Sequence, residues 1–325
     1  MTQPLLDVRG LRIAFGGKAV VRGIDFQIAP GEKLALVGES GSGKTVSALS
    51  LLGLVQDADI SGTAVFSDAL PGTGSRDLLA LPEQALRGIR GKEIAMVFQE
   101  PMTALNALFT VGDQIAEVLE LHEGLGKPAA REAAVQLLAD TGIPEPARRA
   151  RCFPHQLSGG QRQRAMIAMA LACGPKLLLA DEPTTALDVT LQAQILDLMR
   201  ELKAASNAAI ILITHDLGVV AEVCDEVAVM YAGEIVERAP VDELFSNPQH
   251  PYTVGLLGSI PRLDVERERL ATIEGTVPGA NKQPKGCRFA PRCPFADTRC
   301  REAPPPLRDI TPTHRVACWK APVEM

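Results

Sequence analysis

One short loop has the residue types and spacing that bind phosphate groups. Residues 38–45 read Gly-Glu-Ser-Gly-Ser-Gly-Lys-Thr and fit the pattern G-x-x-x-x-G-K-S/T. Glycines let the backbone N–H groups of residues 41–45 approach phosphate oxygens, and a following helix adds its positive N-terminus. Lys44 supplies a positive charge to the same oxygens, and Thr45 offers a hydroxyl to Mg²⁺. The loop therefore predicts a site for the β- and γ-phosphates of a nucleotide.

Two adjacent carboxylates follow a separate apolar run at residues 177–180. We expect Asp181 to hold the water shell of the same Mg²⁺ as a second protein anchor. Glu182 is then next to the attacking water, where a general base typically contributes roughly 10² to 10⁴ in rate. By itself an Asp-Glu pair after a strand usually marks a strand-to-loop junction. The Lys44 loop favours the catalytic interpretation.

Three further side chains lie where they could contact the nucleotide. His215 follows the apolar run 210–214 and can reach the γ-phosphate side, and Gln99 ends the run 94–98 at the same sheet edge. Phe15 lies 29 residues before Lys44 in an N-terminal strand region, where its ring could stack on adenine. A lone residue of each type is more often structural, so their assignment depends on the phosphate loop.

A second anion site is encoded at residues 157–161, which read Leu-Ser-Gly-Gly-Gln. A serine followed by two glycines and a helix over 161–173 makes an exposed helix N-terminus. One nucleotide cannot easily use both anion sites within one chain. We therefore expect Ser158, Gly160 and Gln161 to complete the nucleotide site of a partner subunit.

The elements around these residues alternate as in an α/β protein. Short unbroken apolar runs over 33–37, 94–98, 177–180 and 210–213 predict parallel strands covered on both faces. A helical pattern over 46–54 follows the phosphate loop. Amphipathic patterns over 113–122 and 128–140 predict a small helical subdomain, and residues 227–231 with 234–237 predict a hairpin.

Composition excludes several classes of protein. With 325 residues, of which 46% are hydrophobic, the chain can bury a full core and still carry an appendage. The net charge of −6 argues against nucleic acid as the main partner. No apolar run approaches the roughly 20 residues that span a bilayer, so we expect a cytoplasmic protein.

Four of the seven cysteines, Cys287, Cys293, Cys300 and Cys318, crowd the last 39 residues. Residues 278–325 also hold 9 of the 24 prolines, which disfavour long helices and central strands. A segment this small and loop-rich needs a metal site or a covalent cross-link to stabilise it. In a cytosolic chain such a cluster suggests a metal site. The gaps of five, six and seventeen residues match neither common zinc folds nor the ferredoxin run, so spacing leaves the metal open. Residues 286–325 carry seven Lys plus Arg against four Asp plus Glu. This excess of three positive charges would offset the negative charge of a metal centre with four thiolate ligands.

Together these motifs resemble the ATPase subunits of ABC transporters over about residues 5–240. The resemblance implies a P-loop NTPase core with an N-terminal antiparallel β region and a helical subdomain at about 100–158. It also implies that the chain hydrolyses ATP and that Gln99 joins Thr45 and Asp181 around Mg²⁺. The residues that contact ATP are then Phe15, Gly38, Ser40, Gly41, Ser42, Gly43, Lys44, Thr45, Ser158, Gly160, Gln161 and Asp188, the last within Ala186-Leu187-Asp188.

The C-terminal part of the chain resembles one branch of the ABC transporter ATPases in particular. Residues 247–253, Asn-Pro-Gln-His-Pro-Tyr-Thr, and the Cys-rich segment 287–319 resemble the extension of ATPase subunits that serve dipeptide, oligopeptide and nickel importers. This implies a small irregular extension at 241–325 and a peripheral location on the cytoplasmic face of the inner membrane. The implied partners are a second ATPase subunit, two permeases that face residues 100–111, and indirectly a substrate-binding protein. The branch also implies a 4Fe-4S cluster at the four cysteines, with zinc ranked second and unligated thiols third.

Three alternatives stay open. A nickel or other small-solute importer would share the same motifs as a peptide importer. A soluble ABC ATPase without permease is disfavoured. The DNA-repair type carries a very long coiled-coil insertion between these two motifs, but Lys44 and Ser158 are only 114 positions apart. The translation type holds two ATPase cassettes in one chain, and this chain has one. A redox-sensing regulator would use the cysteine segment as its functional centre.

Overall fold

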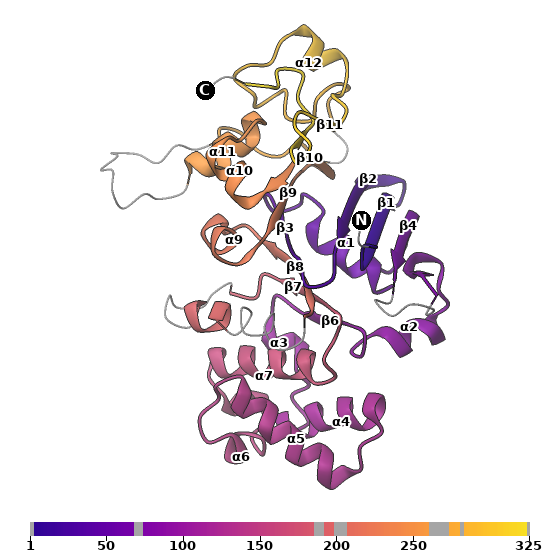
Figure 1. The fold of residues 1–325 in the computed structure, drawn as a ribbon, viewed down its shortest axis with the longest axis vertical. Helices are drawn as coiled ribbons and strands as arrows, with labels where there is room; N and C mark the ends of the chain where they lie inside the picture. Colours follow the sequence, from indigo (N-terminus) through magenta and orange to yellow (C-terminus); the bar gives the residue numbers. More distant parts are fainter. Residues whose placement is uncertain are drawn as a thin grey trace, which may run out of the picture. The chain divides into compact units, whose positions relative to one another are not determined.

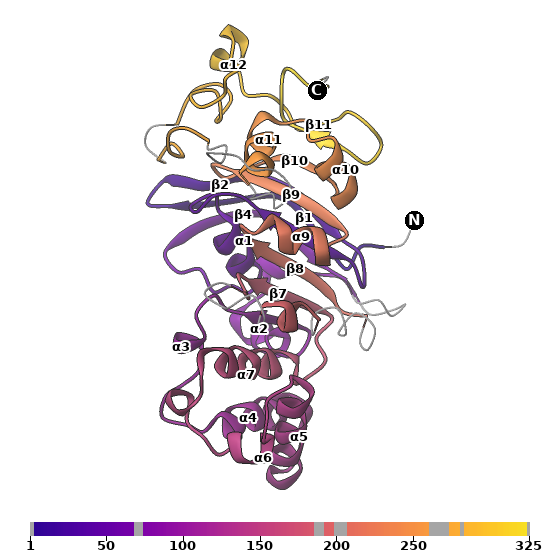
Figure 2. The same ribbon diagram turned by 90° about the vertical axis from the view of Figure 1, so that its left-hand side faces the viewer.

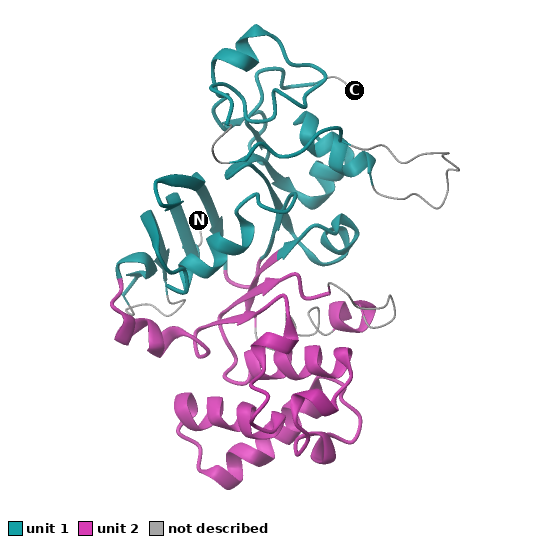
Figure 3. Ribbon diagram, turned by 180° about the vertical axis from the view of Figure 1, so that it is seen from behind, with its two compact units in different colours: residues 1–29, 33–80, 213–325 teal, residues 30–32, 81–212 magenta. Residues whose placement is uncertain are grey.

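The structure is a computed structural model that describes residues 3–67, 74–184, 192–197, 207–259, 273–279 and 283–323. The chain divides into two compact units. The first holds residues 1–29, 33–80 and 213–325, and the second holds residues 30–32 and 81–212. Figure 1 and Figure 2 show the helices and strands in two views, and Figure 3 colours the two units.

The first unit begins with an antiparallel sheet ordered β2-β1-β4-β5. Its strands are β1 (Leu6–Phe15), β2 (Lys18–Ile28), β4 (Ala58–Phe66) and the short β5 (Arg76–Asp77). Side chains of Leu6, Val8, Leu11 and Ile13 alternate along β1 with more exposed neighbours and are fully buried. The expected N-terminal antiparallel β region is confirmed.

The first unit also contains strands ordered β11-β12-β10-β9-β3. Strand β3 (Lys33–Val37) is buried along its whole length and runs parallel to β9 (Glu226–Tyr231). Strand β10 (Glu234–Pro240) returns antiparallel to β9. The two residues between them, Ala232 and Gly233, both have positive φ, 48° and 86°, as tight hairpin turns require. The predicted strand and hairpin are confirmed.

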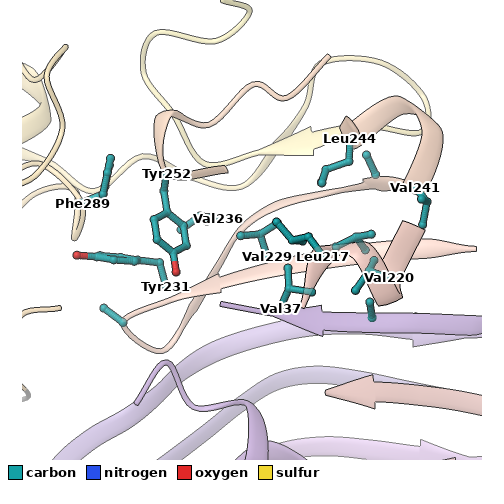
Figure 4. Close-up of a cluster of buried hydrophobic side chains, with 14 residues drawn as sticks. Val37, Leu217, Val220, Val229, Tyr231, Val236, Val241, Leu244, Tyr252 and Phe289 are labelled. Atoms are coloured by element: carbon teal, nitrogen blue, oxygen red, sulfur yellow. The ribbon is translucent and has the colours of Figure 1, made fainter. Parts of the chain in front are cut away.

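One apolar cluster of the first unit joins residues from both sides of position 240 (Figure 4). Val37 and Val229 of the central strands pack with Leu217 of α9 (Leu217–Val223). Residues Val241, Leu244, Tyr252 and Phe289 join the same cluster and are buried. The C-terminal segment thus packs against the strands, while the expected boundary at residue 240 stays a prediction.

Two short strands of the C-terminal segment extend the sheet, where the sequence predicted only irregular structure (Figure 1). Strand β12 (Arg315–Val316) pairs antiparallel with β10, and β11 (Arg308–Asp309) pairs with β12. His314, the residue directly before β12, is fully buried. Its Nε2 lies 2.7 Å from Glu237 Oε1 of β10, and its Nδ1 lies 3.2 Å from Glu243 Oε1. These contacts hold the end of the segment against β10.

The second unit contains strands ordered β8-β7-β6 and a group of helices. Strand β6 (Ile94–Val97) runs parallel to β7 (Leu177–Asp181), and β8 (Ala209–Thr214) has its last two residues in the first unit. Helices α4 (Val111–Glu123), α5 (Lys127–Asp140), α6 (Pro146–Arg149) and α7 (Gly159–Leu171) lie together in both views (Figure 2). Apolar residues of α4, α5 and α7 share one buried cluster. The predicted strands and helices are confirmed within a few residues at their ends.

The remaining elements are short. They are α1 (Lys44–Leu51), η1 (Leu78–Ala80), α2 (Glu83–Ile89), α3 (Pro101–Ala104), η2 (Pro154–Gln156), α10 (Val241–Ser246), α11 (Pro251–Gly258) and α12 (Thr298–Glu302). In the described ranges, no helix has the length and apolar character that crossing a membrane requires.

Candidate active site

The phosphate-type loop connects β3 to α1, as its sequence pattern requires. Gly38, Gly41 and Gly43 have φ values of 151°, 79° and 102°, which side chains rarely allow. A Cβ at Gly38 would lie 2.1 Å from the backbone oxygen of Met230. The glycines therefore set the path of the loop, and Gly43 turns it into the first turn of α1.

Lys44 folds back over this loop. Its Nζ donates hydrogen bonds to Gly38 O at 2.7 Å and Glu39 O at 3.1 Å, and lies 3.4 Å from Ser42 Oγ. The side chain is buried, whereas Thr45 at the next position is exposed. An ammonium group and helix N–H groups converging on one loop can bind a phosphate group.

Two other predicted nucleotide contacts, Phe15 and His215, lie at strand ends of the first unit. Phe15 is the half-buried last residue of β1, opposite Lys18 of β2. His215 directly follows β8 and is exposed. Ser40 lies within the loop itself. Asp188, the remaining predicted contact, lies outside the described residues.

In the second unit, Gln99 and Glu182 contact each other. Gln99 Nε2 donates a hydrogen bond to Glu182 Oε2 at 2.9 Å. The two residues meet because β6 and β7 run parallel and end at the same edge. Asp181 is the buried end of β7, and Glu182 has a φ of 46°, a left-handed conformation that is costly for a glutamate. The structure thus shows a strained carboxylate held by an amide, a conformation that the sequence did not predict.

Ser158 forms the N-cap of α7. Its Oγ accepts a hydrogen bond from Gln161 N at 3.3 Å, and Gln161 Oε1 accepts one from Ser158 N at 3.2 Å. Ser158, Gly160 and Gln161 line an open cavity of about 560 Å³ together with Thr141 and Arg164. Arg164 Nη1 donates to Thr141 O at 3.0 Å. The predicted second anion site therefore lies at a capped helix N-terminus with Arg164 beside it, a residue that was not predicted from the sequence.

The residues proposed for Mg²⁺ carry suitable oxygen atoms. Thr45 offers a hydroxyl in the first unit, and Asp181 and Gln99 offer a carboxylate and an amide in the second. Mg²⁺ is usually held by one or two carboxylates plus nucleotide phosphates and water, so a preformed acidic cage is not required. These residue types fit the ion.

The four C-terminal cysteines are free thiols, of which Cys300 and Cys318 are buried. Backbone N–H of Cys287 donates to Cys300 O at 2.8 Å, which ties two of them together. Burial raises the pKa of Cys287 to about 11 and also raises the pKa of Cys293 and Cys318, which favours neutral thiols. Across the part of the chain that the structure describes, no group of three or more His, Cys, Asp or Glu residues could hold a metal ion. The structure therefore does not support the expected 4Fe-4S cluster or its zinc alternative.

A tryptophan lies in the same segment. Trp319, next to Cys318, donates its indole N–H to Ala303 O at 2.9 Å. The guanidinium carbon of Arg299 lies 3.8 Å from the centre of the indole ring, a cation–π contact. These contacts link the end of the segment to α12.

Fold and site together define a class of protein. A glycine-rich loop between a buried strand and a helix, with a buried lysine folded over it, is the phosphate-binding device of P-loop NTPases. Two carboxylates and a glutamine lie at the ends of neighbouring parallel strands, which is the arrangement expected of an ATP-hydrolysing member of this class.

Comparison with known families identifies the particular family. The family model described as ABC transporter matches residues 21–185, and the model described as oligopeptide/dipeptide transporter, C-terminal region, matches residues 236–300. The chain belongs to the ABC transporter family. The expected family and the expected ABC ATPase fold are confirmed.

Similar proteins and solved structures support the same family assignment. A Brucella melitensis protein, provisionally named a peptide import ATP-binding protein, is 53% identical over 97% of each chain. The oligopeptide transport ATP-binding protein OppD of Salmonella typhimurium is 49% identical over 98% of this chain and 94% of its own. The dimeric, post-hydrolysis structure of the ATP-binding cassette MJ0796 with ADP and Pi has a TM-score of 0.63 at 26% identity, covering 73% of this chain and 98% of its own.

Proposed function

We propose that this chain is the ATP-hydrolysing subunit of a membrane ABC importer of peptides. The observation that carries the proposal is similarity to OppD along nearly the whole chain, including the C-terminal region. A nickel or other small-solute importer of the same branch is the alternative. Cargo is chosen by proteins other than the ATPase, so the phosphate loop and its neighbours do not discriminate between the two.

The proposed catalytic step assigns separate roles to Lys44 and Glu182. Lys44 and the N–H groups at the start of α1 bind the β- and γ-phosphate oxygens. The Glu182 carboxylate accepts a proton from water as the water oxygen attacks the γ-phosphorus and the bond to ADP breaks. Gln99 orients that carboxylate through its N–H. Thr45, Asp181 and Gln99 would hold Mg²⁺, which would supply positive charge to neutralise the phosphates.

Other residues have binding roles in this proposal. Phe15 stacks on adenine and His215 contacts the γ-phosphate, and Asp188, which lies outside the described residues, is a further proposed contact of the nucleotide. Ser158, Gly160 and Gln161 complete the nucleotide site of a second ATPase subunit, because the N-terminus of α7 offers N–H groups to an anion. The dimeric form of the similar cassette MJ0796 supports this arrangement.

The segment after Gln99 is the proposed contact with the permeases. Met102, Leu108 and Phe109 expose 58%, 81% and 55% of their surface. Exposed apolar side chains this close together in the chain favour a protein contact. We place the chain on the cytoplasmic face of the inner membrane, under two permeases that receive peptide from an external binding protein.

The four cysteines are the proposed ligands of a 4Fe-4S cluster, with zinc as the alternative. The proposal rests on the sequence, which crowds the four cysteines into one loop-rich segment, and not on a preformed metal site in the described residues. Iron and sulfide analysis of an anaerobic preparation tests this: about four of each per chain are expected. Cys300→Ser should lose the iron and become protease-sensitive after about residue 278. Stoichiometric zinc, or no metal at all, would contradict the cluster.

Glu182→Gln tests the ATPase role in the transporter assembled with its permeases. We expect ATP binding to persist while peptide-stimulated hydrolysis falls by roughly two orders of magnitude or more, because the amide cannot accept the proton. The matched control is Glu132→Gln, an exposed glutamate of α5, which should leave turnover unchanged. A loss smaller than tenfold would exclude Glu182 as the base, and stimulation by nickel but not by peptide would favour the alternative.

A further inference from the structure

Glu39, the second residue of the phosphate loop, is held by two side chains from beyond residue 240. Its backbone N–H donates a hydrogen bond to Tyr252 Oη at 2.8 Å. Arg292 Nη1 lies 3.0 Å from each carboxylate oxygen of Glu39. Arg292 stands next to Cys293, in the segment that carries the four cysteines. The phosphate loop is thus in direct contact with two distant parts of the C-terminal segment.

Tyr252 is fixed by its neighbours. It is fully buried, with its ring centre 4.6 Å from that of Tyr231 and 5.5 Å from that of Phe289. Figure 4 shows these three rings gathered at one end of the apolar cluster. A hydroxyl on a ring packed this tightly cannot follow a displaced loop. Tyr252 therefore fixes the backbone position of Glu39.

Arg292 is fixed as well. Only 5% of its side chain is exposed. Its Nε donates to Glu274 O at 2.9 Å and its Nη2 donates to Ile273 O at 3.1 Å, so the guanidinium plane cannot rotate freely. The same group lies 5.8 Å from the centre of the Tyr231 ring. A guanidinium held in this way offers a rigid positive partner to the carboxylate.

We propose that Tyr252 and Arg292 are positioning residues of the nucleotide site, which would make the C-terminal segment part of that site. The inference rests on the proposed function. Lys44 Nζ donates to the backbone oxygen of Glu39, so a shift of Glu39 also moves a partner of the phosphate-binding lysine. Arg292 also neutralises a carboxylate that would otherwise repel nucleotide phosphates.

A purely structural role for these contacts predicts a different outcome. If Arg292 only anchored the C-terminal segment, its loss would lower stability but leave the nucleotide affinity of the folded chain unchanged. Arg288 provides the matched control. It lies in the same segment, pairs with Glu234 at 3.3 Å and donates a hydrogen bond to Pro284 O at 2.6 Å, and neither of these partners belongs to the phosphate loop.

The experiment measures binding of ATP with Mg²⁺ to the purified full-length chain by calorimetry. Arg292→Ala should weaken binding about tenfold, because a charge-assisted contact to a partly exposed carboxylate is lost. Tyr252→Phe, which keeps the packed ring and loses the acceptor, should weaken it about threefold. Arg292→Lys should recover part of the loss, and Arg288→Ala should bind as the unmodified chain does.

The decisive variant combines Arg292→Ala with Glu39→Gln. Removing the uncompensated negative charge should restore affinity to within about threefold of the unmodified chain, which a merely unfolded tail would not allow. Equal affinities for Arg292→Ala and Arg288→Ala, or no rescue by Glu39→Gln, would overturn the inference while the ATPase assignment stands. Failure of the unmodified chain to bind ATP would instead overturn the proposed function, and this inference with it.

Discussion

His314→Ala should loosen the end of the C-terminal segment. The substitution removes the imidazole that lies between Glu237 and Glu243. Glu237 is itself fully buried and would keep only the backbone N–H groups of Gln249, at 2.5 Å, and His250, at 3.0 Å, among its described partners. A buried carboxylate would thus lose its cationic partner.

The expected loss of stability follows from the burial of Glu237. Removing one partner of a buried ion pair typically costs about 3 to 5 kcal/mol. The two backbone donors still solvate Glu237, so we expect the low end, about 3 kcal/mol, confined to the segment that β12 joins to β10. In a Glu237→Gln background the same substitution should cost less than about 1 kcal/mol, because no buried charge is left unpaired.

The pH dependence provides a second test. Burial alone would lower the pKa of His314, but its hydrogen bond to Glu237 and the charges of Glu237 and Glu243 raise it above its usual 6.5. A raised folded-state pKa gives stability that is fully present below pH 6.5 and is lost as the pH rises through the folded value. This alkaline loss should be absent in His314→Ala.

The assays are limited proteolysis and thermal unfolding between about pH 6 and 9, a range that brackets the ordinary histidine pKa. Cleavage in the His314→Ala variant should begin within residues 303–323. The reasoning is refuted if the variant loses less than about 1 kcal/mol, or if its stability keeps the alkaline decline of the unmodified chain.

Three further predictions follow. Burial lowers the pKa of His250 to about 4, so this histidine is neutral when folded, and stability should fall as the pH drops from 6.5 toward 4; a His250→Gln variant should lack that acid decline in a denaturation series. Gly38→Ala should abolish ATP binding or folding, because its Cβ would lie 2.1 Å from Met230 O, and binding assays that found normal affinity would contradict the loop geometry. Ser158→Arg should stop turnover of the assembled transporter while ATP affinity of the isolated chain stays near normal; equal loss of affinity would show that Ser158 acts within its own chain.

The phosphate loop and the sheet were predictable from sequence because their information is local. The glycines and Lys44 stand at fixed spacing in one stretch, and an unbroken apolar run such as residues 33–37 has few alternatives to a buried strand. The sequence also placed Gln99 and Glu182 at the ends of buried strands, but it did not predict the hydrogen bond between them. The left-handed φ of Glu182 did not follow, because local strain has no pattern in the residue types.

What the sequence missed depends on contacts between distant residues. Arg292 and Glu39 are 253 positions apart, and nothing in either surrounding stretch marks the other as its partner. Strands β11 and β12 have two residues each, too few for a period-2 pattern. The crowding of four cysteines predicted one metal site. The arrangement of their side chains could not be predicted, because it depends on loops whose sequence has no periodic pattern.

Trp319 gives the C-terminal segment an optical signal of its own. It is the chain's single tryptophan, and its indole is held by Ala303 O and covered by Arg299. Tryptophan emission moves to longer wavelength when the ring becomes hydrated, so intrinsic fluorescence reports the unfolding of this segment alone. The loosening of the four-cysteine region can therefore be followed in the unlabelled protein, separately from the unfolding of the strands and helices elsewhere in the chain.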